Sequence, residues 1–494
     1  MNNKITINKL NYLGFAGILF FFILSFRFYT TGDDIALITG LRFAVDCIKN
    51  NPAMIPCGDE VLPFPVFQYL IGAPFVLMNF DNSSIVKVFI VLNSLMSFLS
   101  GYLFFSLGKK RAGEAGGIFS LLLILSGYMM WYVMASFNEA TSFALISLFI
   151  YGILFRFNII LLSFIAFLCC ITKEVLFPYL LLMSYLAYSI RDENRGNSII
   201  KNLLRFFKAY KITLICLFLG VTFNLAFNYF RFGSIRNLGY LNPIYSNPIE
   251  YVPIFFVDIL FSPAAGLFFV WLSAFSMIAY YLVFYIIKFK NNLCILISII
   301  CFLAINIGLA TWFSPFGAVA WGPRLTLPFI GGLLILVLYS EINNLIRFFN
   351  GKYYILKNFI LTCFFIISAL PTVAFILEPL HFHQISQSIK SKVEIESGIK
   401  NFTIETAGSP LYQEALIQNL KQNIIIPTAI EVVERNFIIV SLYFFSLMLL
   451  STSVTIRKSN LVFYISLVIM SVLMVLSIPS SYNFKNLFSL LVSR

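Results

Sequence analysis

Charged residues are scarce in this chain: Asp, Glu, Lys and Arg make up only 11% of its 494 residues. A soluble domain carries about 25% charged residues, so this scarcity excludes a set of ordinary soluble domains. Hydrophobic residues make up 60% of the sequence, and they occur in runs of roughly 20 residues, the length that crosses a membrane as a helix. The composition therefore predicts a polytopic membrane protein.

The chain also lacks features of other membrane-protein classes. No small-residue cleavage site follows the first apolar run, Tyr12 to about Tyr29, so we expect this run to remain as a membrane span. No internal repeat is visible, which weakens an inverted-repeat transporter. Charged residues are almost absent from the middle of the spans, and Asp258 lies near an outer end. This absence also disfavours a transporter or flippase.

Histidine and cysteine are few. The only histidines, His381 and His383, have no cysteine nearby, and we interpret them as surface residues rather than metal ligands. Six of the eight cysteines lie inside apolar runs, where a small hydrophobic side chain is the ordinary interpretation. The other two, Cys47 and Cys57, share one polar loop and could form a disulfide if that loop faces an oxidising space.

The apolar runs predict an all-α protein with about 13 transmembrane helices. A further stretch, 64–80, is short and broken by Pro65, Gly72 and Pro74, and we interpret it as interfacial or re-entrant. An apolar-rich helix near residues 35–45 is expected to lie in the membrane interface. The predicted spans are 11–30, 85–108, 114–134, 139–155, 157–172, 175–190, 212–230, 261–287, 292–312, 324–342, 355–377, 437–456 and 460–479.

The basic residues predict the orientation. With the N-terminus inside, the cytoplasmic segments hold 19 of the 34 lysines and arginines but only 4 of the 21 acids, as the positive-inside rule requires. We therefore expect a bacterial inner membrane protein with a cytoplasmic N-terminus and large outer loops at 31–80 and 378–436. The second loop could form a small subdomain between a transmembrane module, 1–377, and a C-terminal hairpin and tail, 437–494.

Two adjacent aspartates, Asp33 and Asp34, directly follow the first predicted span. One aspartate is enough to cap a helix, so capping is one explanation. Two neighbouring carboxylates repel each other and raise the pKa of at least one, which suits a general base. Their position suggests a catalytic base that faces a non-cytoplasmic compartment.

Other polar and aromatic residues recur at the outer ends of the later spans. Each has an ordinary explanation: a carboxylate complements a helix dipole, an arginine snorkels to the interface, and aromatic residues form a belt. Each also suits a substrate, because cations bind phosphate and aromatic faces are platforms for sugar rings. The candidate substrate-binding residues are Glu139, Lys173, Arg231, Tyr240, Trp321 and Arg324.

The order of these elements resembles the integral-membrane glycosyltransferases of the GT-C type. This family includes the protein O-mannosyltransferases and the lipid A aminoarabinose transferase. The resemblance touches most of the first 330 residues, and the last third of the chain resembles nothing specific. The matching parts are the Asp33-Asp34 pair, the interfacial helix behind it, Glu139, the run Asn228–Tyr240, the turn Ser262-Pro263 to Gly266-Leu267, and Trp321-Gly322-Pro323-Arg324.

The resemblance implies an inverting glycosyltransferase without a required cofactor. Such an enzyme moves a sugar from a polyprenyl-phosphate donor to a glycan, lipid or protein acceptor on the outer face. By resemblance, Asp33 is the base that deprotonates the acceptor hydroxyl. Many relatives have Asp-Glu where this chain has Asp-Asp, which leaves the role of Asp34 open. Some relatives use a divalent cation, which Asp33 and Glu139 could hold here.

The leaving group of such a reaction is a phosphate, so positive charge is expected opposite the base. Arg324, Arg231 and Lys173 are the candidates, in that order. A polysaccharide polymerase or ligase is the alternative. Its chemistry is expected to use arginines in a late outer loop, where this chain has only Arg435.

Overall fold

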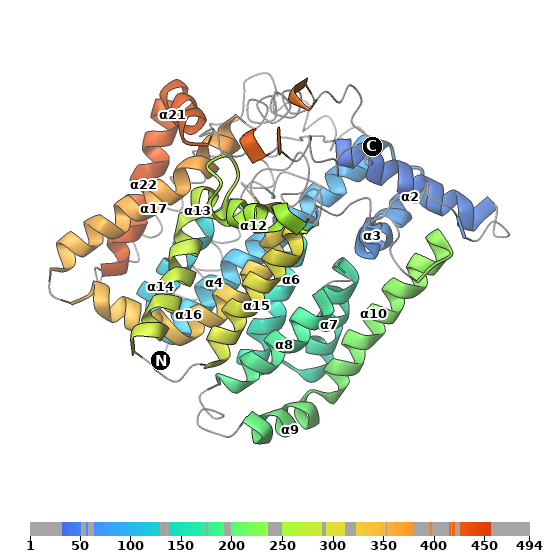
Figure 1. Cartoon of the computed structure of the whole chain (residues 1–494), viewed down its shortest axis with the longest axis horizontal. Helices are drawn as coiled ribbons and strands as arrows, with labels where there is room; N and C mark the ends of the chain where they lie inside the picture. The colour runs from blue at the N-terminus through green and yellow to red at the C-terminus, as the bar shows by residue number, and fades with distance from the viewer. Residues whose placement is uncertain are drawn as a thin grey trace, which may run out of the picture.

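The structure is a computed structural model, and every regular element in the part of the chain that it describes is a helix (Figure 1). Among the described residues, four helices are long and apolar enough to cross a membrane by length and composition, and several shorter ones are also apolar. The first and last predicted spans lie outside the described residues, so the count of 13 stays a prediction. The described residues are 32–50, 56–57, 64–128, 132, 138–173, 176–191, 199–235, 249–288, 293–311, 323–351, 353–378, 395–397, 414–415, 417–419 and 425–455.

Most of the helices coincide with predicted spans to within a few residues. One exception is the span predicted at 261–287, which is broken by the turn Ser262–Gly266 and continues as α14 only from Leu272. The helices are α2 (Gly32–Asn50), α3 (Val66–Leu77), α4 (Asn82–Leu125), α6 (Glu139–Leu154), α7 (Ile159–Thr172), α8 (Leu176–Ser189), α9 (Ile199–Ala209), α10 (Lys211–Phe232), η3 (Ile249–Tyr251), α12 (Val252–Phe261), α13 (Leu267–Val270), α14 (Leu272–Lys288), α15 (Leu293–Ala310), η4 (Arg324–Thr326), α16 (Leu327–Phe349), α17 (Tyr354–Leu377), α21 (Ile425–Arg435) and α22 (Phe437–Thr455).

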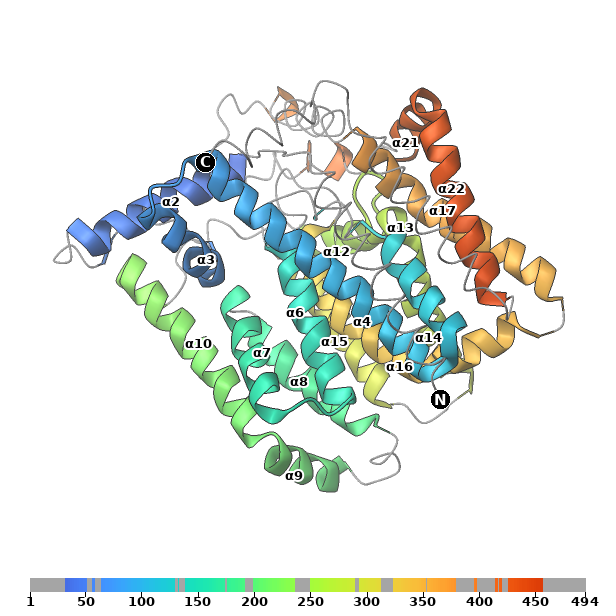
Figure 2. The ribbon, with the colours of Figure 1, turned by 180° about the vertical axis from the view of Figure 1, so that it is seen from behind.

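The long element α4 is a hairpin of two helices. Its backbone leaves helical geometry at Ala112 and Gly113, where Gly113 has a φ of 72° that suits glycine. The two halves then pack closely, because a Cβ on Gly108 would lie only 2.1 Å from the carbonyl oxygen of Gly116. Figure 2 shows the two halves joined at the lower end of the molecule. The hairpin confirms the predicted reversal near residue 110, although the second half ends at Leu125 rather than at 134.

Two central helices, α6 and α16, form the middle of the core. Nearly every residue of α6 is buried, and α16 packs directly against it and against α4. The contact is close because Gly331 of α16 faces Phe143 and Ser147 of α6. Both helices begin at the same end of the molecule, so their first residues, Glu139 and the segment at Arg324, become neighbours.

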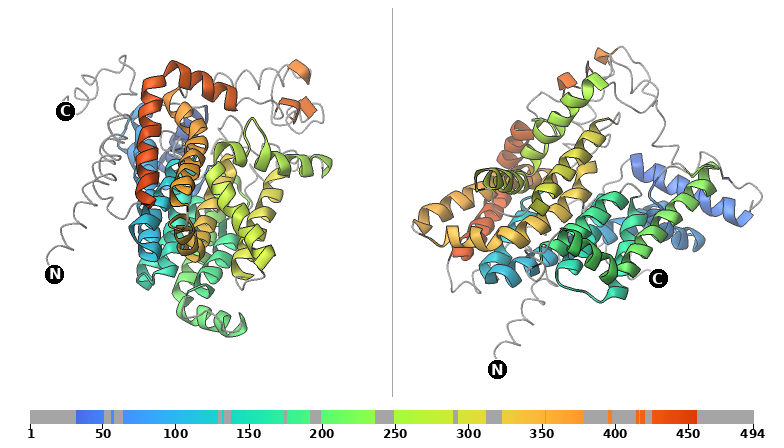
Figure 3. Two further views of the ribbon diagram at one scale, coloured as in Figure 1. Left: turned by 90° about the vertical axis from the view of Figure 1, so that its left-hand side faces the viewer. Right: turned by 60° about the horizontal axis from the view of Figure 1, so that its bottom comes forward.

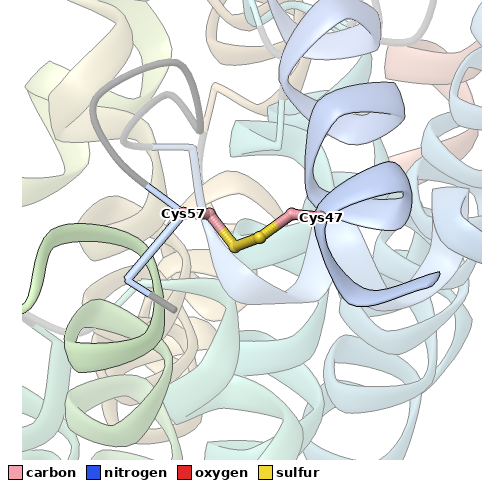
Figure 4. The surroundings of a disulfide bond; sticks show 2 residues. All are labelled: Cys47 and Cys57. Atoms are coloured by element: carbon pink, nitrogen blue, oxygen red, sulfur yellow. A yellow bond between two sulfur atoms is a disulfide. The ribbon is translucent and has the colours of Figure 1, made fainter. Parts of the chain in front are cut away.

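The first outer loop was predicted to contain an apolar-rich helix near residues 35–45 and an interfacial or re-entrant stretch at 64–80. The structure has a helix in each place, α2 and α3. They pack on each other and on the start of α4, and α2 lies at a steep angle to α10 (Figure 1). The sequence left a disulfide between Cys47 and Cys57 open, and the structure contains it, with a Cα–Cα distance of 6.1 Å. Figure 4 shows that this bond joins α2 to the segment beside α10. The Cys57 N–H also donates to the Phe230 carbonyl of α10 at 3.0 Å, so the disulfide connects α2 to a segment that is held against α10.

Candidate active site

Three charged side chains from distant parts of the sequence meet at one end of the bundle. Glu139 Oε1 lies 3.7 Å from Lys173 Nζ and 3.5 Å from Arg324 Nε. The Glu139 side chain is only 9% exposed, and those of Arg324 and Lys173 are 12% and 22% exposed. All three were candidate substrate-binding residues, and the fold brings them into one cluster.

Hydrogen bonds next to each charged residue hold the cluster in place. Asn138 Nδ2 donates to the Thr172 carbonyl at 2.7 Å, which ties the start of α6 to the end of α7. The residues that this bond joins directly precede Glu139 and Lys173. Tyr128 Oη donates to the Pro323 carbonyl at 3.1 Å, one residue before Arg324. Each bond contributes about 0.5–1.5 kcal/mol, and together they fix the backbone on which the charges are carried.

Counting only residues that the structure describes, the cluster carries one excess positive charge, since two cations share one carboxylate. Burial lowers the pKa of the Lys173 ammonium, Glu139 opposes this, and the nearby Arg324 guanidinium lowers the pKa further. Charges held in a partly buried site beside a membrane are costly and mark functional sites by default. A phosphate would complete the charge balance with hydrogen bonds to both cations.

Two buried tyrosines flank the cluster and were not predicted from the sequence. Tyr128 and Tyr132 are fully buried, and their rings meet edge to face with centroids 5.9 Å apart. Burial is the main cause that raises the pKa of both phenols, and the Glu139 carboxylate raises that of Tyr128 further. The Arg324 guanidinium opposes part of the shift in the pKa of Tyr132, and both phenols remain neutral O–H groups. The prediction missed them because it continued a span through this segment to residue 134.

A buried tryptophan, Trp271, fixes this corner. Its Nε1 donates to the Leu123 carbonyl at 2.9 Å, and its ring lies against Tyr128. A Cβ on Gly127 would lie 2.2 Å from that ring, so only glycine fits there. The sequence signal that could have found the corner is the glycine directly before Tyr128.

Arg231 lies in a different setting at the end of α10. It is 2% exposed, and its Nη1 donates to the Phe64 carbonyl at 2.7 Å, while Nε and Nη2 donate to Asn228 Oδ1. The rings of Phe227 and Phe232 flank the guanidinium. These contacts with protein groups favour a structural role, in which Arg231 attaches the first outer loop to α10.

The aspartate pair belongs to the same end of the molecule as the charged cluster. Asp33 and Asp34 lie in the first turn of α2, as predicted, and their side chains are outside the described part of the structure. The helix α2 packs on the start of α4, whose Asn93 Oδ1 accepts a 2.7 Å hydrogen bond from Thr141 Oγ1 of α6. Of the other candidates, Tyr240 and Trp321 also fall outside the described residues.

The remaining candidates are the possible metal ligands and the arginine of the late outer loop. Among those residues, no three His, Cys, Asp or Glu side chains lie together in a way that could hold a metal ion. His381 and His383 fall outside them. Arg435, the arginine of the late outer loop, pairs with Glu378 at 3.0 Å and also with Glu431.

Comparison with protein-family models and with curated proteins gives no match for this chain. The class indicated by the described residues is therefore that of a helical membrane protein with a buried ionic cluster at one end.

Proposed function

We propose that this protein is an inverting glycosyltransferase that uses a polyprenyl-phosphate sugar donor. The observation that carries the proposal is the cluster of Glu139, Lys173 and Arg324. It supplies a net positive charge at the end of the bundle where α2 carries Asp33 and Asp34. A base and a phosphate-binding group are the two parts that this reaction needs.

The proposed reaction assigns a step to each part. Asp33 takes the proton of the acceptor hydroxyl, and the acceptor oxygen attacks the anomeric carbon from the face opposite the phosphate. A new C–O bond forms while the bond from that carbon to the phosphate oxygen breaks. The polyprenyl phosphate leaves as an anion and is stabilised by Arg324 and Lys173. Glu139 positions these two cations and limits their repulsion.

The setting in a membrane supports the same substrate class. A polyprenyl chain stays in the bilayer, so an enzyme that uses it gains from membrane-embedded helices around the site. We place the site on the outer face, in the bacterial inner membrane, because the charge distribution favours this orientation. The disulfide between Cys47 and Cys57 supports it, since such bonds persist in oxidising compartments.

The alternative of a polysaccharide polymerase or ligase has less support. Arg435 is paired with two glutamates, which leaves the late outer loop without an evident arginine centre. Residues near 414–419 contact α12, where Ile417 packs with Phe255 and Ile259, and this loop is our candidate for acceptor recognition.

The test is a transfer assay with purified full-length protein and a panel of polyprenyl-phosphate sugars. We expect Asp33→Asn to abolish transfer while Asp46→Asn, an exposed acid on the same helix, retains it. Unchanged transfer in Asp33→Asn would remove Asp33 as the base. Movement of the donor lipid between leaflets without any sugar transfer would refute the enzyme assignment.

A further inference from the structure

The short helix α9 presents three different faces. One face packs on α8, where the Phe206 ring lies 5.8 Å from that of Tyr185 and 5.7 Å from that of Tyr188. A second face exposes apolar side chains, and a third carries only polar and basic ones. The exposed apolar residues are Ile200, Leu203, Leu204 and Phe207, and the basic residues are Lys201, Arg205 and Lys208. An exposed apolar face beside a basic face is typical of a helix that lies in a membrane interface.

An apolar groove continues from this helix onto α10. Its volume is about 520 Å³, within the range of roughly 300–1,000 Å³ that ligand sites occupy. Phe207 of α9 forms one part of the wall, and the apolar residues Leu214, Ile215, Phe218 and Leu219 of α10 form most of the remainder, with Thr222 at one end. Phe218 is 62% exposed and Leu219 is 54% exposed, so this side of α10 faces away from the bundle.

A cation stands at the α9 end of the groove. Lys211, the first residue of α10, is exposed and lines the groove. Lys208, in the last turn of α9, adds a second positive charge nearby in the chain. Between residues 199 and 230 the sequence holds four cations and no acid. An apolar channel with a basic head matches the chemistry of an anionic lipid.

The basic end of the groove, at the start of α10, lies at the opposite end of the bundle from the candidate active site. The helix α10 has 22 residues and is therefore about 33 Å long, close to the thickness of the hydrocarbon core. Its far end holds Arg231, which contacts the first outer loop. The left view of Figure 3 shows α9, in green, lying across the lower end of the molecule. By the charge rule this end faces the cytoplasm.

We propose that this groove is a binding site for an anionic phospholipid of the inner leaflet. One acyl chain lies along Ile215, Phe218 and Leu219, and the phosphate contacts Lys211 and Lys208. The site is separate from the proposed sugar-transfer reaction and does not depend on it.

The test measures lipid binding to delipidated full-length protein by native mass spectrometry. Phosphatidylglycerol and phosphatidylcholine with the same acyl chains are titrated separately. We expect phosphatidylglycerol to bind more tightly and the double variant Lys208→Gln/Lys211→Gln to lose about fivefold in affinity per lysine removed. Arg347→Gln, which removes an exposed cation from the end of α16, is the matched control and retains the wild-type affinity.

A second measurement locates the lipid. Phosphatidylglycerol with a photoreactive group in one acyl chain is expected to label the peptide that contains residues 207–222. Equal binding of the two lipids, unchanged affinity in the double variant, or labelling confined to other helices would overturn the proposal. A cross-link from Phe218 to a second copy of the protein would also overturn the proposal, because it would show that another chain covers the groove.

Discussion

Arg231 and Arg324 both lie next to a long apolar run of the sequence, but their side chains have different contacts in the structure. Each lies at a helix end on the proposed outer side, and each is largely buried. The Arg231 guanidinium donates to neutral acceptors, the Phe64 carbonyl and Asn228 Oδ1. Arg324 instead shares the Glu139 carboxylate with Lys173.

The difference separates an arginine with structural contacts, Arg231, from one for which we propose a role in binding, Arg324. Neutral acceptors hold a guanidinium firmly and join two segments of chain. A carboxylate shared by two cations leaves an excess positive charge, which favours an incoming anion. The same residue type therefore serves the fold in one place and the proposed chemistry in the other. The experiments below test this contrast, starting with the largest expected effect.

Replacing Arg324 should remove most of the proposed activity. We expect Arg324→Ala to lower kcat for transfer by about 100- to 1,000-fold, the effect of losing one group that stabilises a developing charge. Arg324→Lys should recover only part of the rate, because it retains the charge but not the planar fork. Lys49→Gln, an exposed cation at the end of α2, is the control. Wild-type kcat in Arg324→Ala would show that Arg324, like Arg231, has a structural role.

Removing the disulfide tests the region to which Arg231 belongs. The bond between Cys47 and Cys57 closes a loop with a sequence separation of 10, so Cys47→Ser/Cys57→Ser should cost about 3 kcal/mol of stability. Thermal unfolding of the purified protein should show a lower Tm, and wild type treated with reductant should match it. The free Cys216 lies on α10, and Cys216→Ser should leave Tm unchanged. Equal Tm values for wild type, reduced wild type and the Cys47→Ser/Cys57→Ser variant would mean that the bond does not stabilise the first outer loop.

Replacing Arg231 should act mainly on stability. Hydrogen bonds to a charged group contribute about 1.5–3 kcal/mol, and we expect Arg231→Gln to lower Tm accordingly. Loss of the guanidinium should also loosen the attachment of the segment at Phe64, which we would measure as faster hydrogen exchange in residues 64–70. Transfer per folded molecule should fall far less than in Arg324→Ala. A large loss of kcat with an unchanged Tm would place Arg231 in the binding site.

The hydrophobicity and length of the apolar runs were enough to predict most of the long helices. The range 139–155 was predicted as a span, and α6 covers Glu139–Leu154. The second half of α4 was predicted too long, because the residues after Leu125 remain apolar although the chain turns there to pack Gly127 on Trp271. The packing of Gly127 against a tryptophan far away in the chain is a tertiary contact, and local composition does not predict it.

The candidate site could be predicted as a set of residues but not as a cluster. Charges at span ends identified Glu139, Lys173 and Arg324 individually. Their contact depends on which helices are neighbours in space, and a single sequence does not give that order. The same limit explains Arg231, whose acceptor at Phe64 lies far away in the chain.

The pH dependence of Lys173 is the smallest expected effect and the most specific to the cluster. Because burial and Arg324 lower the pKa of this ammonium, the folded protein loses its proton at a lower pH than the unfolded chain does. In that window the unfolded chain binds more protons, so Tm should rise with pH. Affinity for polyprenyl phosphate should fall over the same range, since the neutral amine no longer attracts the anion. Lys173→Arg should show neither trend up to about pH 10, because arginine stays charged, and an affinity that falls equally in this variant would contradict the assignment to Lys173.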